Sequence, residues 1–153
     1  MSLLGIDVGT TGCKAVAFSE DGRELSEVYQ EYDISSPQTG WAVLDSTDVW
    51  EKVKQVIREA AGIAAENNKD PVQALAVCSM GEAMVPVTME REILGPSIMN
   101  FDSRGGEYVR SLADFQDDEW LYTINGNTLA NNYGLTKLLW VRDNQPELYK
   151  KAD

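Results

Sequence analysis

Residues 3–16 read Leu-Leu-Gly-Ile-Asp-Val-Gly-Thr-Thr-Gly-Cys-Lys-Ala-Val. An apolar run over residues 3–8 leads into a Gly-Thr-Thr-Gly segment, and a second apolar run follows over residues 13–19. Short apolar runs predict buried strands, and a glycine-rich segment between two of them predicts a tight turn. The chain is therefore expected to open with a hairpin of two buried strands.

The turn of this hairpin carries residue types that suit phosphate binding. Glycines let the backbone approach a ligand closely, and turn N–H groups together with two threonine hydroxyls can converge on phosphate oxygens. A carboxylate supplies the hard oxygen that a hydrated Mg²⁺ prefers, and a lysine adds a positive charge. An ordinary glycine-containing hairpin with an unrelated aspartate is the alternative. The candidate phosphate-binding residues are Asp7 (also the candidate metal ligand), Gly9, Thr10, Thr11 and Lys14.

The composition of the 153 residues excludes several function classes. A net charge of −12 disfavours a nucleic-acid or membrane-surface partner. The chain contains no histidine, which excludes Ser-His-Asp and Cys-His catalysis as well as histidine metal sites. The length predicts one domain with a sizeable core.

Cellular location is predicted from the cysteines and from the absence of targeting segments. Cys13 and Cys78 lie in apolar runs, and we expect both to be buried free thiols in a reducing compartment. The sequence shows no signal peptide and no apolar stretch of membrane-spanning length. A cytoplasmic protein is therefore expected.

A third strand and a long helix are expected after the hairpin. Residues 23–32 predict a half-exposed strand, joined to the hairpin by a turn at residues 20–22. From Val49 to residues 67–71, apolar residues recur on one helical face, namely Val53, Val56, Ile57, Ala60, Ala61 and Ala64. Residues 72–78 are expected to form a strand parallel to the first. This order predicts an α/β fold whose mixed sheet contains an antiparallel three-strand meander, with flanking helices.

The second half of the chain predicts shorter elements. Strands are expected over residues 83–89 and 93–99, and helices over residues 104–115, 120–124, 134–143 and from Pro146. The helix over residues 134–143 is expected to direct most of its apolar side chains inward, namely Leu135, Leu138, Leu139 and Val141.

Two segments after predicted strands are candidates for ligand binding. Gly81 and Glu82 follow a buried strand, and ligands gather at the carboxyl ends of strands in open α/β sheets. Glu82 can accept hydrogen bonds from two hydroxyls of a polyol, although a strand-end turn with a solvated glutamate is the alternative. Asp102 can cap the following helix. Arg104 opposes the dipole of that helix, which indicates a buried partner or a ligand contact.

A polar loop over residues 126–133 precedes the helix at residues 134–143. Asparagines bind hydroxyl groups well, but they are also ordinary loop residues. Packing and solvated helix faces account for Lys137, Trp140 and Tyr149.

The hairpin turn resembles the first phosphate loop of the actin, Hsp70 and sugar kinase superfamily, and the order of strands and helix resembles a ribonuclease-H-like lobe. Taken together, the segments resemble the N-terminal lobe of the FGGY carbohydrate kinases. The most telling stretches are residues 7–14, 40–50, 79–82, 96–104 and 136–141. The resemblance identifies residues 1–153 as an incomplete N-terminal lobe, without the second lobe that clamps ATP.

This resemblance implies that the full-length protein uses ATP and Mg²⁺ to phosphorylate a hydroxyl of a small sugar or polyol. It places the terminal ATP phosphates and Mg²⁺ at the hairpin turn. It places the acceptor in a pocket that includes Gly81, Glu82, Asp102, Arg104 and Asn132. The catalytic base of the family is an aspartate expected after Asp153, so residues 1–153 alone are expected to be inactive. No nucleic-acid or membrane partner is implied, and a homodimer of the full-length protein is compatible with the resemblance.

Gly81 and Glu82 depart from the familiar members of this family. Glycerol kinases have arginine where Gly81 stands, and xylulose kinases have Met-His in place of both residues, so the acceptor stays open. A non-catalytic sugar- or nucleotide-binding regulatory lobe on the same fold is the alternative function. A ribonuclease-H-like nuclease with Asp7, Glu82 and Asp102 as metal ligands is a third, which the Gly-Thr-Thr turn and the acidic composition oppose.

Overall fold

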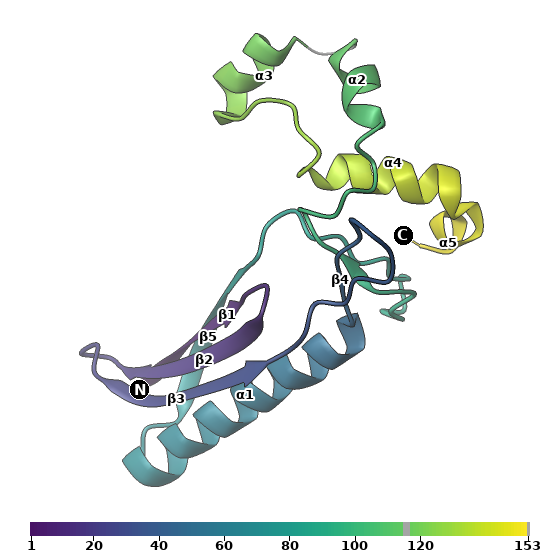
Figure 1. Cartoon of the computed structure of the whole chain (residues 1–153). Coiled ribbons are helices and arrows are strands. Elements are labelled where there is room, and N and C mark those ends of the chain that lie inside the picture. Colours follow the sequence, from purple (N-terminus) through teal and green to yellow (C-terminus); the bar gives the residue numbers. More distant parts are fainter. Residues whose placement is uncertain (115–116, 153) are drawn as a thin grey trace. The chain divides into compact units, whose positions relative to one another are not determined.

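A computed structural model describes residues 1–114 and 117–152 of the chain (Figure 1). Its contacts divide the chain into two compact units. The first unit consists of residues 1–34 and 46–80, and the second consists of residues 35–45 and the residues from 81 onward. No helix in the described part of the chain is both long and apolar enough to cross a membrane.

A four-stranded sheet in the order β3-β2-β1-β5 forms the first unit. Its strands are β1 (Ser2–Val8), β2 (Gly12–Ser19), β3 (Glu24–Glu31) and β5 (Val72–Ser79). β1 pairs antiparallel with β2 and parallel with β5, and β2 pairs antiparallel with β3. The predicted mixed sheet with its antiparallel meander is therefore confirmed.

The helix α1 (Ser46–Asn68) lies along one face of this sheet, mainly over β2 and β3 (Figure 1). Its period of 3.6 residues brings a row of small and branched side chains onto the sheet. The buried residues of this interface are Val53, Val56, Ala60 and Ala64 of the helix and Leu4, Ile6, Ala15 and Ala17 of the strands. The predicted apolar face of the helix is thus confirmed.

The edge strand β5 is less covered than the sequence predicts. Leu75 stands in register with Leu4 on the face that α1 covers elsewhere, yet it is exposed, as is Val77. Cys13 is buried as expected, but the expectation that Cys78 is buried is wrong. Cys78 stands in register with Asp7, on the face of the sheet opposite the buried Leu4 and Ile6, where Leu3 and Asp7 are exposed as well.

The second unit is built from short elements. They are β4 (Val43–Leu44), β6 (Ser97–Ile98), α2 (Tyr108–Ala113), α3 (Asp118–Asn125), α4 (Gly134–Asn144) and α5 (Pro146–Lys151). β4, which the sequence does not predict, pairs antiparallel with β6. The prediction of a strand over residues 83–89 is wrong, because only isolated bridges form there, and the strand predicted over residues 93–99 is reduced to β6. Pro86 and Pro96 lack the N–H groups that a continuous ladder requires.

The helices of the second unit agree with the sequence except at one start. The helix predicted over residues 104–115 begins only at Tyr108 as α2. Gly105 has a φ of +83°, which a right-handed helix cannot include, so α2 starts after it. Phe115, the predicted end of that helix, lies outside the described residues. The helices predicted over residues 120–124, 134–143 and from Pro146 are confirmed by α3, α4 and α5.

The buried side of α4 is not the predicted leucine face. Val141 is buried as predicted, but Leu135 and Leu138 are 51% and 41% exposed. Thr136 and Lys137 are buried instead. Backbone carbonyl groups of the preceding loops face this side of α4, and buried carbonyl groups require hydrogen-bond donors. The hydroxyl of Thr136 and the ammonium group of Lys137 therefore lie on the buried face of α4, where periodicity alone predicts leucines.

Candidate functional site

The turn between β1 and β2 is closed by contacts within the first unit. The N–H of Gly9 donates to the carbonyl oxygen of Gly12 at 2.9 Å. A Cβ atom on Gly12 would overlap the hydroxyl of Tyr29 and the carbonyl oxygen of Gln30, both on β3. Glycine is therefore required at position 12, because β3 approaches the turn so closely.

Tyr32 supports the turn from its inner side. Its hydroxyl lies 2.6 Å from the carbonyl oxygen of Gly9 and 2.9 Å from that of Gly12, and its N–H donates to the carbonyl oxygen of Thr11 at 3.1 Å. Tyr32 is 5% exposed, and burial raises the pKa of its hydroxyl to about 12, with smaller contributions from Cys13 and Asp7. The hydroxyl therefore stays protonated at neutral pH, and three carbonyl groups of the turn face protein donors.

Thr10 and Thr11 carry the donors that this turn leaves free. Within residues 1–114 and 117–152, neither their N–H groups nor their hydroxyl groups have a hydrogen-bond partner. Thr11 is exposed and Thr10 is half-buried. A turn with donors on three of its carbonyl groups and with its own threonine donors free has the polarity of an anion-binding site.

Asp7 and Lys14 lie opposite each other on β1 and β2, so their side chains project from the same face of the sheet. The Nζ of Lys14 lies 2.8 Å from Oε1 of Glu27, and this hydrogen bond raises the pKa of Lys14. The positive charge of Lys14 is therefore paired with the carboxylate of Glu27. Asp7 is exposed, and the described residues contain no group of three or more metal-ligating side chains. A hydrated Mg²⁺ fits Asp7, since this ion is commonly held by one or two carboxylates, water and phosphate oxygens.

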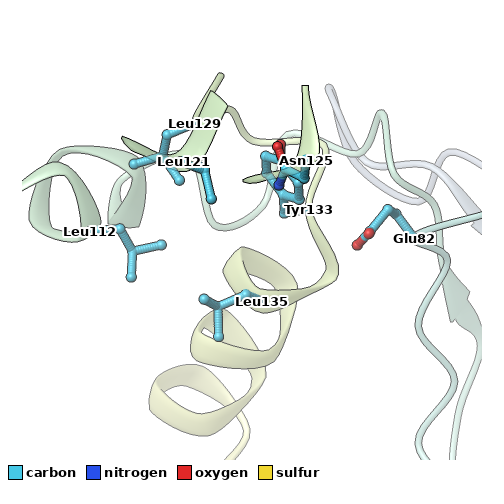
Figure 2. Close-up of a pocket in the computed structure, with 7 residues that line it drawn as sticks. All are labelled: Glu82, Leu112, Leu121, Asn125, Leu129, Tyr133 and Leu135. Atoms are coloured by element: carbon cyan, nitrogen blue, oxygen red, sulfur yellow. The ribbon is translucent and has the colours of Figure 1, made fainter. Parts of the chain in front are cut away.

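Glu82, in the second unit, is held in a strained conformation beside α4. Its φ of +62° lies in the left-handed region, which is uncommon for a residue other than glycine. One carboxylate oxygen, Oε2, accepts the N–H of Gly134, the first residue of α4, where the helix dipole favours a negative charge. The other oxygen, Oε1, has no hydrogen-bond partner in the described part of the chain. Glu82 also lines a cavity of about 280 Å³ (Figure 2).

Gly81 is exposed next to Glu82, and a Cβ atom added to it would meet open space. Space for a ligand or for a larger side chain is therefore present at this position. Strained residues such as Glu82 are common at ligand sites, where the surrounding structure holds them in place.

Asp102 and Arg104 form a buried ion pair. Oδ1 of Asp102 accepts the backbone N–H and Nε of Arg104 at 2.8 and 2.9 Å, and Oδ2 accepts Nη2 of Arg104 and the N–H of Ala42, each at 2.6 Å. Burial opposes the ionisation of Asp102, but these hydrogen bonds outweigh it and lower its pKa. The guanidinium of Arg104 lies 4.0 Å from the ring centroid of Trp41, which contacts Trp140 edge to face. The buried partner expected for Arg104 is therefore Asp102.

Lys137 completes this buried cluster and is missed by the sequence analysis, which assigns it to packing or a solvated face. Its Nζ donates to the carbonyl oxygens of Asp102, Arg104 and Asn131 at 2.7, 2.9 and 2.6 Å. The side chain is fully buried, and burial lowers its pKa against the opposing effect of Asp102. The signal in the sequence is a Thr136-Lys137 pair inside an otherwise leucine-rich helix.

The candidate acceptor residues thus differ in their surroundings. Asp102 and Arg104 are 1% and 6% exposed, and they hold the loop around them, whereas Gly81, Glu82 and Asn132 are exposed. Asn131, next to Asn132, donates from Nδ2 to the carbonyl oxygens of Asp102 and Ser103. Roles in acceptor binding stay predictions for all of these residues.

Comparison with known proteins gives matches that span nearly the whole chain. A sequence model described as the FGGY family of carbohydrate kinases, N-terminal domain, matches residues 2–153. The autoinducer-2 kinase of Klebsiella pneumoniae is 32% identical over 155 residues, which cover 98% of this chain and 29% of that protein.

Solved structures show the same fold. A xylulose kinase from Rhodospirillum rubrum superposes with a TM-score of 0.89 at 26% identity, covering 99% of this chain and 31% of that one. A Plasmodium falciparum glycerol kinase with ADP gives a TM-score of 0.85 at 18% identity, covering 98% and 30%. The predicted lobe of the actin-like ATPase fold is therefore confirmed. The chain spans 29–31% of the length of these three proteins.

Proposed function

Because the chain belongs to the FGGY family of carbohydrate kinases, as its sequence predicts, we propose that the full-length protein transfers the γ-phosphoryl group of ATP to a hydroxyl of a small sugar or polyol. The relatives named above are kinases of autoinducer-2, xylulose and glycerol. Residues 1–153 supply the first phosphate-binding turn and part of the acceptor site, and the general base is contributed from outside them.

The polarity of the β1–β2 turn carries this proposal. Free N–H and hydroxyl groups of Thr10 and Thr11 donate to the terminal phosphates, while Gly9 closes the turn and Gly12 lets β3 pack closely against it. Preorganised donors aimed at developing charge supply most of the catalysis in phosphoryl transfer. Lys14 adds a positive charge, which forms an ion pair with Glu27 when no phosphate is bound.

Asp7 holds a hydrated Mg²⁺ beside this turn. When bound, the ion offsets charge on the phosphate oxygens and on the leaving ADP. The exposed carboxylate of Asp7 belongs to no cluster of acidic ligands among the described residues, so water and phosphate would supply the other ligands of the ion.

The acceptor is held by Glu82, whose free Oε1 accepts a hydroxyl of the sugar or polyol. Gly81 leaves room for the acceptor, and Asn132 contributes a polar side chain from the loop before α4. Asp102 and Arg104 act as positioning residues that hold the loop around them, because their polar atoms are already paired with each other. The acceptor oxygen attacks the γ-phosphorus, the bond to ADP breaks, and the hydroxyl proton passes to the base.

Phosphorylation by the full-length protein tests this function. ADP release is measured with Mg²⁺, ATP and a panel of three- to six-carbon polyols and ketoses. Asp7→Asn is expected to lower kcat by about 10²-fold or more, as when one preorganised contact to developing charge is lost. Asp21→Asn, in the other hairpin turn of the same sheet, is the matched control and is expected to keep the wild-type rate.

Two outcomes would contradict the proposal. One is an unchanged rate in Asp7→Asn, which would remove the phosphate assignment of the turn. The other is full-length protein that binds a polyol without consuming ATP, which would favour a regulatory lobe on this fold.

A further inference from the structure

The cavity beside Glu82 is charged at one end and apolar at the other. It lies within the second unit and has a volume of about 280 Å³. Four leucines from α2, α3, α4 and the loop between the last two line it, namely Leu112, Leu121, Leu129 and Leu135. Figure 2 shows Leu112, Leu121 and Leu129 on one side of the cavity and the Glu82 carboxylate on the other.

Two other polar oxygen atoms of the lining are hydrogen-bonded to the surrounding loop. The hydroxyl of Tyr133 donates to the carbonyl oxygen of Thr128 at 3.2 Å. The side-chain oxygen of Asn125 accepts the N–H of Asn127 at 2.8 Å. Oε1 of Glu82 is therefore the strong acceptor that the cavity offers to a ligand.

A ligand of this cavity must match both ends. A hydroxyl next to Glu82 gains a charge-assisted hydrogen bond. A hydroxyl among the leucines loses its water without gaining a partner, whereas an alkyl group loses nothing there. The lining therefore selects a molecule with hydroxyl groups at one end and an alkyl group at the other.

We infer that the acceptor of this protein is a deoxy polyol or deoxy ketose, whose hydroxyls lie at Glu82 and whose methyl or other alkyl end lies among Leu112, Leu121 and Leu129. This inference rests on the proposed function, which assigns Glu82 to the acceptor. A hydrophobic pocket discriminates against an added hydroxyl group by about 10- to 100-fold. That range is the preference expected between a deoxy acceptor and its fully hydroxylated parent.

Paired acceptors measure the preference in the full-length protein. The pairs are D-xylulose with 1-deoxy-D-xylulose, and glycerol with propane-1,2-diol, each compared by kcat/KM. The deoxy member of at least one pair is expected to be favoured about 10- to 100-fold. Equal or lower kcat/KM for the deoxy member of both pairs would overturn the inference while leaving the proposed function intact.

A variant at Leu121 tests whether the leucines cause the preference. Leu121→Gln is expected to reduce the preference about tenfold or more, whereas Leu121→Met, which keeps an apolar side chain of similar volume, is expected to retain it. Leu138→Gln is the matched control, since Leu138 is exposed on α4 outside the cavity. An unchanged preference in a folded Leu121→Gln protein would overturn the inference, as would loss of preference in Leu121→Met.

Failure of the proposed kinase function differs from failure of this inference, because it would appear as no ADP release with any acceptor. Calorimetric binding of propane-1,2-diol and glycerol without ATP would then decide the inference: tighter binding of the diol would support it, and equal binding or none would overturn it.

Discussion

Replacing Tyr32 with phenylalanine removes one oxygen atom from the first unit and leaves the aromatic ring in place. The lost hydroxyl lies 2.6 Å from the carbonyl oxygen of Gly9 and 2.9 Å from that of Gly12. Gly12 keeps a second donor, the N–H of Gly9, whereas the Gly9 carbonyl has no other partner among the described residues. The variant therefore leaves one inward-facing carbonyl group without a donor.

The size of this effect follows from that single unpaired group. A buried acceptor without a donor costs about 1–3 kcal/mol, and the Gly9 contact is only partly buried, so we expect Tyr32→Phe to lower the free energy of unfolding by about 1–2 kcal/mol. Urea unfolding of the chain measures this loss as a lower midpoint with an unchanged m-value. Tyr29→Phe is the matched control, because the Tyr29 hydroxyl has no hydrogen bond in the described residues and Tyr29 is 46% exposed.

Two further measurements test the role of the Tyr32 hydroxyl in the turn: the kinetics with ATP and the dependence of stability on pH. In the full-length protein, Tyr32→Phe is expected to lower kcat/KM for ATP about tenfold, the factor that corresponds to about 1.4 kcal/mol, without changing the KM of the acceptor. Burial raises the pKa of Tyr32 from its ordinary value of about 10 to about 12. Its stabilisation is therefore complete below pH 10 and is lost as the pH rises through 12, a loss that the variant should lack. Wild-type stability and wild-type ATP kinetics in Tyr32→Phe would refute this role.

Three other perturbations probe the same framework. Lys137→Met should destabilise the chain by about 3–5 kcal/mol in denaturant unfolding, because three carbonyl groups lose their donor and each unpaired buried group costs about 1–3 kcal/mol. Lys150→Met on the exposed side of α5 should change stability by less than about 0.5 kcal/mol. Equal effects of the two substitutions would contradict the buried cluster. Gly12→Ala should cost about 1–3 kcal/mol through overlap with β3, and Gly81→Ala should be neutral, which thermal melts of the two variants would show or disprove. The pKa of Asp102 is lowered in the folded protein, so its ionised carboxylate stabilises the fold above its ordinary pKa of about 3.9, and this stabilisation is lost as the pH falls through the folded pKa. The unfolding midpoint of Asp102→Asn should therefore change less with pH in the acid range than that of the wild type. An identical pH dependence of the two proteins would exclude this contribution.

Local patterns predict the first unit well. The hairpin strands, the meander and α1 each depend on neighbours within a few residues, through alternation, turn glycines or the helical repeat. The phosphate-binding candidates Asp7, Thr10 and Thr11 are predicted for the same reason, since all lie in one short stretch at the end of β1 and in the turn after it. The family and the fold follow from these segments in their order along the chain.

Distant partners explain what the sequence does not predict. Lys137 is buried because carbonyl groups of Asp102 and Arg104, more than 30 residues earlier, need a donor, and no repeat in α4 encodes that need. Tyr32 likewise contacts Gly9 and Gly12 from the end of a different strand. The cavity lining depends on the packing of α2, α3 and α4, which periodicity within any one helix does not determine.

Tyr32 and Lys137 solve the same physical problem in the two units. Each places a donor on inward-facing carbonyl groups, which would otherwise lack hydrogen-bond partners away from water. At the β1–β2 turn the free donors of Thr10 and Thr11 are proposed to bind phosphate although the net charge of the chain is −12, because short hydrogen bonds act over a few ångströms while distant surface charge is screened by salt. ATP affinity of the full-length protein should therefore depend weakly on ionic strength and strongly on the Tyr32 hydroxyl, and a steep salt dependence that Tyr32→Phe leaves unchanged would show that general electrostatics dominates.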